Sequence, residues 1–83
     1  MEQDHIVIIF HNHKNEQQQD LEVPLDISAN ELIIGLNQGF QLGIDVSDMA
    51  ACFLRAENPI AFLKGSKTLK EYGLHNGTVI HYL

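Results

Sequence analysis

The sequence has little cysteine, no tryptophan, few basic side chains and no long hydrophobic run. Its one cysteine, Cys52, cannot form an internal disulfide, and no apolar stretch approaches the roughly 20 residues of a membrane-spanning helix. Five Lys and Arg against eleven Asp and Glu give a formal net charge of −6. This charge argues against binding nucleic acid through phosphate neutralisation. The first five residues are acidic where a signal peptide would be basic. We therefore expect an acidic cytoplasmic protein that neither binds nucleic acid nor inserts into a membrane.

The composition is otherwise that of an ordinary globular protein. Hydrophobic residues make up 45% of the 83 residues and charged residues 19%, which is not the signature of disorder. The length allows one domain, residues 1–83, and we find no internal repeat or linker.

The first third of the chain predicts a hairpin. Residues 5–11 are short, β-branched and almost all apolar, which is typical of a strand with both faces partly covered. Residues 12–19 are polar and predict a connecting loop, whereas residues 20–25 alternate polar and apolar side chains. Pro24 lacks a backbone N–H, so this second strand is expected at an edge of a sheet.

One helix and three further strands are expected next. Ser28 and Glu31 have the spacing of a capping box, and apolar side chains at helical intervals predict a helix over residues 29–42 that Gly43 ends. Residues 52–56 predict a third strand with Cys52, Leu54 and Ala56 on one face. Residues 60–63 and 78–83 predict two more strands, introduced by the turns at residues 58–59 and 76–77. This order is typical of an α+β fold in which one helix covers one face of a sheet.

No residue pattern predicts catalysis. His11 and His13 offer two possible metal ligands on one strand face, but zinc sites need three or four, and no Cys pair or carboxylate–histidine spacing completes a set. Cys52 has apolar neighbours, which raise a thiol pKa and reduce its reactivity. No nucleophile elbow, phosphate-binding glycine loop or metalloprotease motif is present. The sequence predicts no enzyme activity, no cofactor and no metal site.

The element order and the segment at residues 68–83 resemble the ubiquitin β-grasp. Tyr72 and Leu74 occupy positions at which ubiquitin-like chains brace a loop before the last strand. The length, the opening strand and the segments 20–25 and 69–83 are more similar still to the YukD/EsaB family. The resemblance implies a five-stranded mixed sheet of order 2-1-5-3-4 packed on one helix, with the first and last strands parallel at its centre. It also implies that one face of the sheet meets the helix through Ile6, Ile8, Phe10, Leu54, Ile80 and Tyr82.

The same resemblance implies a function. YukD/EsaB proteins are ubiquitin-like accessory components of type VII secretion in Gram-positive bacteria, which exports small helical WXG-type substrates. The chain is therefore expected to be a non-enzymatic cytoplasmic interaction module. Its expected partners are protein components of the secretion machinery, including the membrane-bound ATPase, and a second copy of the chain.

Two other functions stay open. A ubiquitin-like modifier or sulfur carrier acts through a C-terminal Gly-Gly, whereas this sequence ends in Tyr82-Leu83, so we expect no conjugation through Leu83. A β-grasp docking protein of another complex is compatible with the same fold, because fold does not determine function. Residues 49–83 hold four of the five basic side chains and only two of the eleven acidic ones. This asymmetry fits either a solvated surface or a basic region that attracts an acidic partner.

The face of the sheet away from the helix is the candidate docking surface. Strand alternation and the implied strand order place on it the candidate docking residues Val7, Ile9, Phe53, Val79, His81 and Leu83, and also His11. Large exposed apolar patches usually mark interaction sites, and ubiquitin-like proteins commonly bind partners through a similar surface. The alternatives are that these are ordinary scattered surface hydrophobes, or that the loop at residues 12–19 folds over them.

Overall fold

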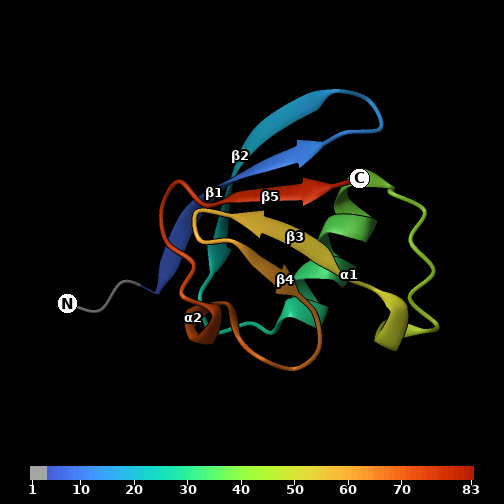
Figure 1. Ribbon diagram of the computed structural model, residues 1–83. Helices are drawn as coiled ribbons and strands as arrows, with labels where there is room; N and C mark the ends of the chain where they lie inside the picture. The colour runs from blue at the N-terminus through green and yellow to red at the C-terminus, as the bar shows by residue number, and fades with distance from the viewer. Residues whose placement is uncertain (1–3) are drawn as a thin grey trace.

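The computed structural model describes residues 4–83, so the predicted domain at residues 1–83 includes three residues outside the described part. One sheet lies across a long helix, with two short helical turns at its margins (Figure 1). The elements are β1 (His5–Asn12), β2 (Gln17–Pro24), α1 (Ala29–Phe40), the 3-10 turn η1 (Met49–Ala51), β3 (Leu54–Glu57), β4 (Ala61–Leu63), α2 (Leu69–Tyr72) and β5 (Val79–Tyr82).

The sheet has the predicted strand order, β2-β1-β5-β3-β4. Its two central strands, β1 and β5, are parallel, and their register places Ile9 opposite Val79 and His11 opposite His81. The other pairs are antiparallel. Pro24 lies in the edge strand β2, as its missing N–H predicted. The sheet thus joins the first and last strands of the sequence at its centre.

The core lies between α1 and one face of the sheet. Ile6, Ile8 and Phe10 of β1 are buried, and the rings of Phe10 and Phe40 lie 4.9 Å apart between their centroids. Cys52, Leu54 and Ala56 are buried together, which confirms the predicted register of the third strand. Tyr82 is half-buried against this core, and its hydroxyl donates to the carbonyl of Leu42 at 3.1 Å. The buried apolar residues also include Val23, Ala29, Leu32, Ile33, Leu36, Leu63, Leu69, Leu74 and Ile80.

The helix begins as predicted and ends earlier. The Ser28 hydroxyl accepts from the backbone N–H of Glu31, whose carboxylate accepts from the N–H of Ser28, so the capping box forms. α1 ends at Phe40 rather than at Leu42, because Gln41 adopts the left-handed conformation with φ of 53°. The expectation that Gly43 ends the helix was therefore wrong by two residues.

Other differences from the sequence prediction concern short elements. Residue 12 and residues 17–19, predicted as loop, belong to β1 and β2, because the hairpin pairs Asn12 with Gln17 at its end. The helical turns η1 and α2 were not predicted. The predicted brace at Tyr72 is present: its hydroxyl donates to the carbonyl of Lys64 at 2.9 Å.

The turn α2 has a capping box of its own, which predicts a response to acid. Hydrogen bonds from the backbone and hydroxyl of Thr68 hold the pKa of Glu71 below its ordinary value of 4.5. Glu71 then binds a proton more readily in the unfolded chain than in the folded one. Its ionised carboxylate therefore stabilises the fold above about pH 4.5, and this stabilisation is lost as the pH falls through the pKa of the folded state. Urea melts should show that Glu71→Gln loses less free energy of unfolding on acidification than the unmodified chain does. The amide oxygen of the glutamine can still accept from Thr68. Equal acid losses in the two proteins would contradict this.

Candidate functional site

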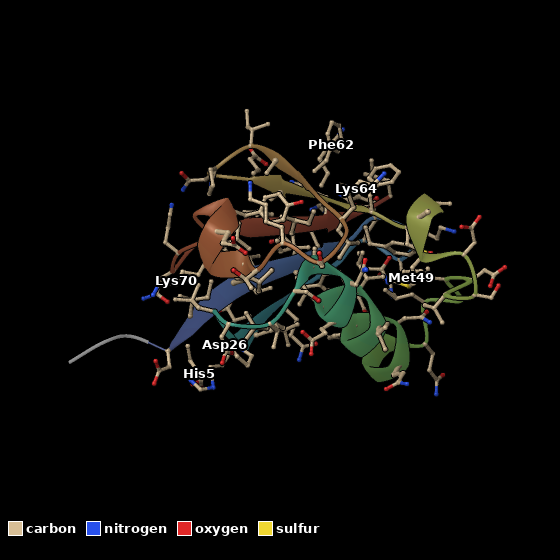
Figure 2. The ribbon with its side chains drawn as sticks, turned by 90° about the horizontal axis from the view of Figure 1, so that it is seen from below. His5, Asp26, Met49, Phe62, Lys64 and Lys70 are labelled. Atoms are coloured by element: carbon tan, nitrogen blue, oxygen red, sulfur yellow. The ribbon has the colours of Figure 1, made fainter. Side chains whose placement is uncertain are left out.

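The face of the sheet opposite α1 carries a row of paired side chains that crosses all five strands. The strand registers align Gln18 of β2, His11 of β1, His81 of β5, Arg55 of β3 and Phe62 of β4. Phe62 is exposed and points away from α1 (Figure 2). We call this surface the open face.

The candidate docking residues lie on the open face on either side of this row. Val7, Ile9 and Val79 precede it along β1 and β5, whereas Phe53 and Leu83 follow it, and His81 belongs to it. Val7, Phe53 and Leu83 are 44, 54 and 58% exposed; the side chains of Ile9, Val79 and His81 are half-buried. The register therefore separates two apolar groups by the four polar members of the row, which we call the polar row: Gln18, His11, His81 and Arg55.

An aromatic pair extends the second apolar group. The rings of Phe53 and Phe62 meet edge to face with centroids 5.7 Å apart. Sequence reasoning missed Phe62. Alternation in the predicted strand at residues 60–63 nevertheless places Phe62 and the buried Leu63 on opposite faces of that strand.

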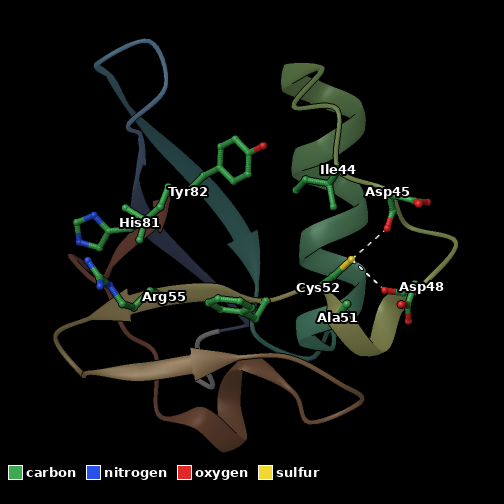
Figure 3. A pocket seen from close by; sticks show the side chains of 10 residues that line it. Ile44, Asp45, Asp48, Ala51, Cys52, Arg55, His81 and Tyr82 are labelled. Carbon is green, nitrogen blue, oxygen red and sulfur yellow. Dashed lines mark hydrogen bonds between the residues drawn. The ribbon is translucent and has the colours of Figure 1, made fainter.

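A shallow groove of about 420 Å³ opens beside Phe53 and the end of β5 (Figure 3). Phe53, His81 and Leu83 line it together with the segment that carries Cys52. The Cys52 thiol is buried and lies 3.3 Å from the carbonyl oxygen of Asp45 and 3.4 Å from that of Asp48. Cys52 thus anchors the wall of the groove as a small buried side chain.

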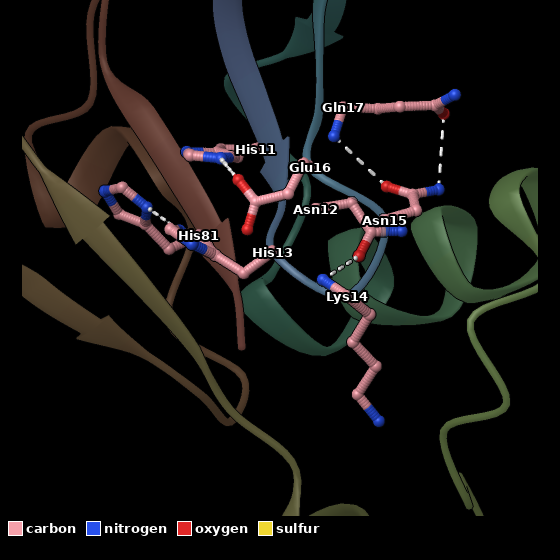
Figure 4. Close-up of polar contacts among 8 residues, drawn as sticks. All are labelled: His11, Asn12, His13, Lys14, Asn15, Glu16, Gln17 and His81. Atoms are coloured by element: carbon pink, nitrogen blue, oxygen red, sulfur yellow. Dashed lines mark hydrogen bonds and ion pairs between the residues drawn. The ribbon is translucent and has the colours of Figure 1, made fainter.

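Three histidines gather at the end of the central strands (Figure 4). Potential ligand atoms of His11, His13 and His81 all lie within 4.8 Å of one another. Nε2 of His13 is 2.8 Å from Nδ1 of His81, and the rings of His11 and His13 stack with centroids 3.7 Å apart. The sequence prediction had found only two of these three possible ligands.

Two carboxylates border the histidines. Oε1 of Glu57 lies 2.9 Å from Nε2 of His81, and Oε2 of Glu16 lies 4.0 Å from Nε2 of His11. Two residues of the loop predicted at residues 12–19, His13 and Glu16, therefore lie beside His81 and His11, whereas Val7 and Phe53 stay exposed, so the loop covers part of the candidate surface only.

The hairpin turn fixes these positions through its own polar side chains. The backbone N–H of Lys14 donates to Asn12, and that of Gln17 donates to Asn15. Glu16 adopts the left-handed conformation with φ of 57°. The backbone N–H of His13, the first residue after β1, donates to the carbonyl of Tyr82 at 2.9 Å. The parallel pairing with β5 therefore continues past the end of β1 and holds His13 close to His81.

The close packing of the imidazoles affects the protonation of His13. Partial burial lowers the pKa of His13 below its ordinary value of 6.5, and the rings of His11 and His81 lower it further. Glu16 acts in the opposite direction. His13 is therefore neutral near pH 7, the form that can accept a hydrogen bond or bind a metal.

The strand order and single covering helix define the class as the ubiquitin-like β-grasp, an α+β fold. The chain is similar to the C-terminal ubiquitin-like domain of mouse tubulin-specific chaperone e, with 15% identity and a TM-score of 0.73 over 94% of this chain and 84% of that one. The ubiquitin-like domain of tubulin-binding cofactor B gives 19% identity and a TM-score of 0.72 over 94% and 87%. The ubiquitin-like domain of yeast Ddi1 gives 21% identity and a TM-score of 0.64, over 96% of this chain and 91% of that one. Likeness at these identities establishes the fold alone.

The family is narrower than the fold. The family described as "WXG100 protein secretion system (Wss), protein YukD" matches residues 6–81. The chain belongs to the YukD family, as the resemblance in its sequence predicted, and so to the ubiquitin-like accessory proteins of type VII secretion. No curated protein matches it significantly in sequence. None of the helices within residues 4–83 is long and apolar enough to cross a membrane.

Proposed function

We propose that the chain is a non-enzymatic, cytoplasmic interaction module that regulates a type VII secretion system by binding one of its protein components. The observation that carries this proposal is the family match over residues 6–81. The membrane-bound ATPase of the machinery is the partner we propose, through the part of it that faces the cytoplasm.

The open face supports this role as the docking surface. Phe53 and Phe62 expose two aromatic rings that contact each other, and Phe53 lines the groove together with Leu83. Aromatic side chains are enriched at protein interfaces. Arg55 lies between Phe62 and His81 across the sheet, and can pair with an acidic partner at the rim. Val7, Ile9 and Val79 supply a second apolar contact across the polar row.

The prediction is that removing both aromatic rings strongly weakens docking. Phe53→Ser combined with Phe62→Ser should weaken binding to the purified cytoplasmic part of the ATPase at least tenfold, because aromatic anchors dominate interface energies. Calorimetry measures the affinity, and circular dichroism checks that the fold is unchanged.

Val46→Ser is the matched control, since Val46 is an exposed apolar side chain outside the sheet. It should bind like the unmodified chain. Undiminished binding by the double variant would exclude the open face as the docking surface, and no binding by the unmodified chain would exclude this ATPase segment as the partner. Sedimentation of the same variants tests whether two copies pair through this face.

A further inference from the structure

We propose that His11, His13 and His81 bind a divalent transition-metal ion of the zinc class, with Glu57 orienting His81. The site is independent of the proposed docking function, because it depends on the geometry of the histidine cluster. It would lie at the polar row of the open face, between the two apolar groups.

The first argument is the number and kind of ligands. Three protein ligands with an open fourth position are typical of zinc sites that also bind water, and three imidazoles form one such set. Imidazole nitrogen suits zinc, copper and nickel, whereas calcium and magnesium prefer oxygen. The possible ligand atoms are already within 4.8 Å of one another. In a tetrahedral site with bonds of 2.0–2.1 Å, nitrogen atoms are about 3.3 Å apart, so modest side-chain rotation brings the three rings to one ion.

The second argument is the hydrogen bond behind His81. Glu57 accepts from Nε2–H of His81 at 2.9 Å, which leaves Nδ1 of that ring with a lone pair facing His13. Metal-binding histidines commonly donate their other N–H to a carboxylate, which fixes the ring and makes it a stronger ligand. A metal ion would take the place of the contact between Nδ1 of His81 and Nε2 of His13. Neutral His13 would then carry its one proton on Nδ1, so that its Nε2 can bind the metal.

The third argument is that the ligands are already held in place. The side chains of His11 and His81 are only 17 and 13% exposed, so little side-chain freedom is left to lose on binding. Adjacent central strands hold both residues, and the backbone bond from His13 to Tyr82 holds the third. The Glu16 carboxylate at the edge adds a negative charge that favours a cation.

The test is titration of the tag-free, chelator-treated chain with zinc chloride, followed by calorimetry. We expect one ion per chain, a rise in melting temperature with added zinc, and at least a tenfold loss of affinity in His13→Gln and in His81→Gln. His75→Gln is the matched control, because the exposed His75 ring contacts the carbonyl of Asn76 instead of the cluster. Circular dichroism of each variant checks the fold. No zinc binding, or equal binding by His81→Gln and the unmodified chain, would overturn the proposal.

The orienting role of Glu57 has its own test. Glu57→Gln should weaken zinc binding about tenfold, the lower end for loss of such a partner. Glu22→Gln removes the same charge from β2, opposite Val7, and should bind zinc like the unmodified chain. Nitrogen chemical shifts of the imidazoles should report coordination through Nδ1 of His81. Coordination through Nε2 of His81, or equal affinities in the two glutamate variants, would overturn this role.

Discussion

Leu54→Ala should lower the free energy of unfolding by about 2–5 kcal/mol, because it removes buried methyl groups and leaves a cavity. Leu54 is 1% exposed and lies in the core formed by the sheet and α1. Urea denaturation followed by circular dichroism measures the loss. For a chain of this size, such a loss is a large part of the total stability.

The adjacent residue provides the control for Leu54. Phe53 projects to the open face, and its main aromatic neighbour is Phe62, so Phe53→Ala should cost about 1 kcal/mol or less. The opposite ranking of the two variants would mean that the strand is turned over, with Phe53 in the core.

Thr78→Val should lower the free energy of unfolding by about 1–3 kcal/mol without changing the shape of the side chain. The Thr78 hydroxyl is fully buried; it donates to the carbonyl of Asn58 at 2.8 Å and accepts from the N–H of His75 at 3.1 Å. Valine fills the same space but leaves both backbone groups without this partner.

Thr78→Ser separates the hydroxyl from the methyl group. Serine keeps both hydrogen bonds and loses one buried methyl group, which is worth about 1 kcal/mol. Denaturant melts should therefore rank serine as more stable than valine. The reverse ranking would mean that packing, rather than hydrogen bonding, holds Thr78 in place.

The sequence predicted the long elements because their signals are local. Alternation identified the inward face of the third strand, and the Ser28–Glu31 spacing identified the start of α1. The end of α1 could not be predicted, because the residue in the left-handed conformation is Gln41 and not a glycine, the residue type that usually signals such an end. The turn α2 was missed although Thr68 and Glu71 repeat the capping-box spacing, because four residues are too few to show helical periodicity.

The histidine cluster was missed for a different reason. Alternation and the implied strand order already placed His11 and His81 on one face of two neighbouring strands. The register between those two strands could not be predicted from the sequence, because no hairpin joins parallel strands and fixes which residues pair. The hairpin conformation that brings Glu16 beside His11 depends on contacts of Asn12 and Asn15 with the backbone, which composition alone does not reveal.

The parallel pairing of β1 with β5 also affects how the chain reaches its native state. β1 leaves the ribosome first, and its inner edge has no partner until β5 has been made. Contacts between residues so distant in sequence form slowly, because a long loop must close first. During that interval the apolar residues 6–10 present an unpaired strand edge, which is a template for association with other chains. Pairing of β5 with β1, which follows the synthesis of the last strand, therefore ends the period in which aggregation competes with folding.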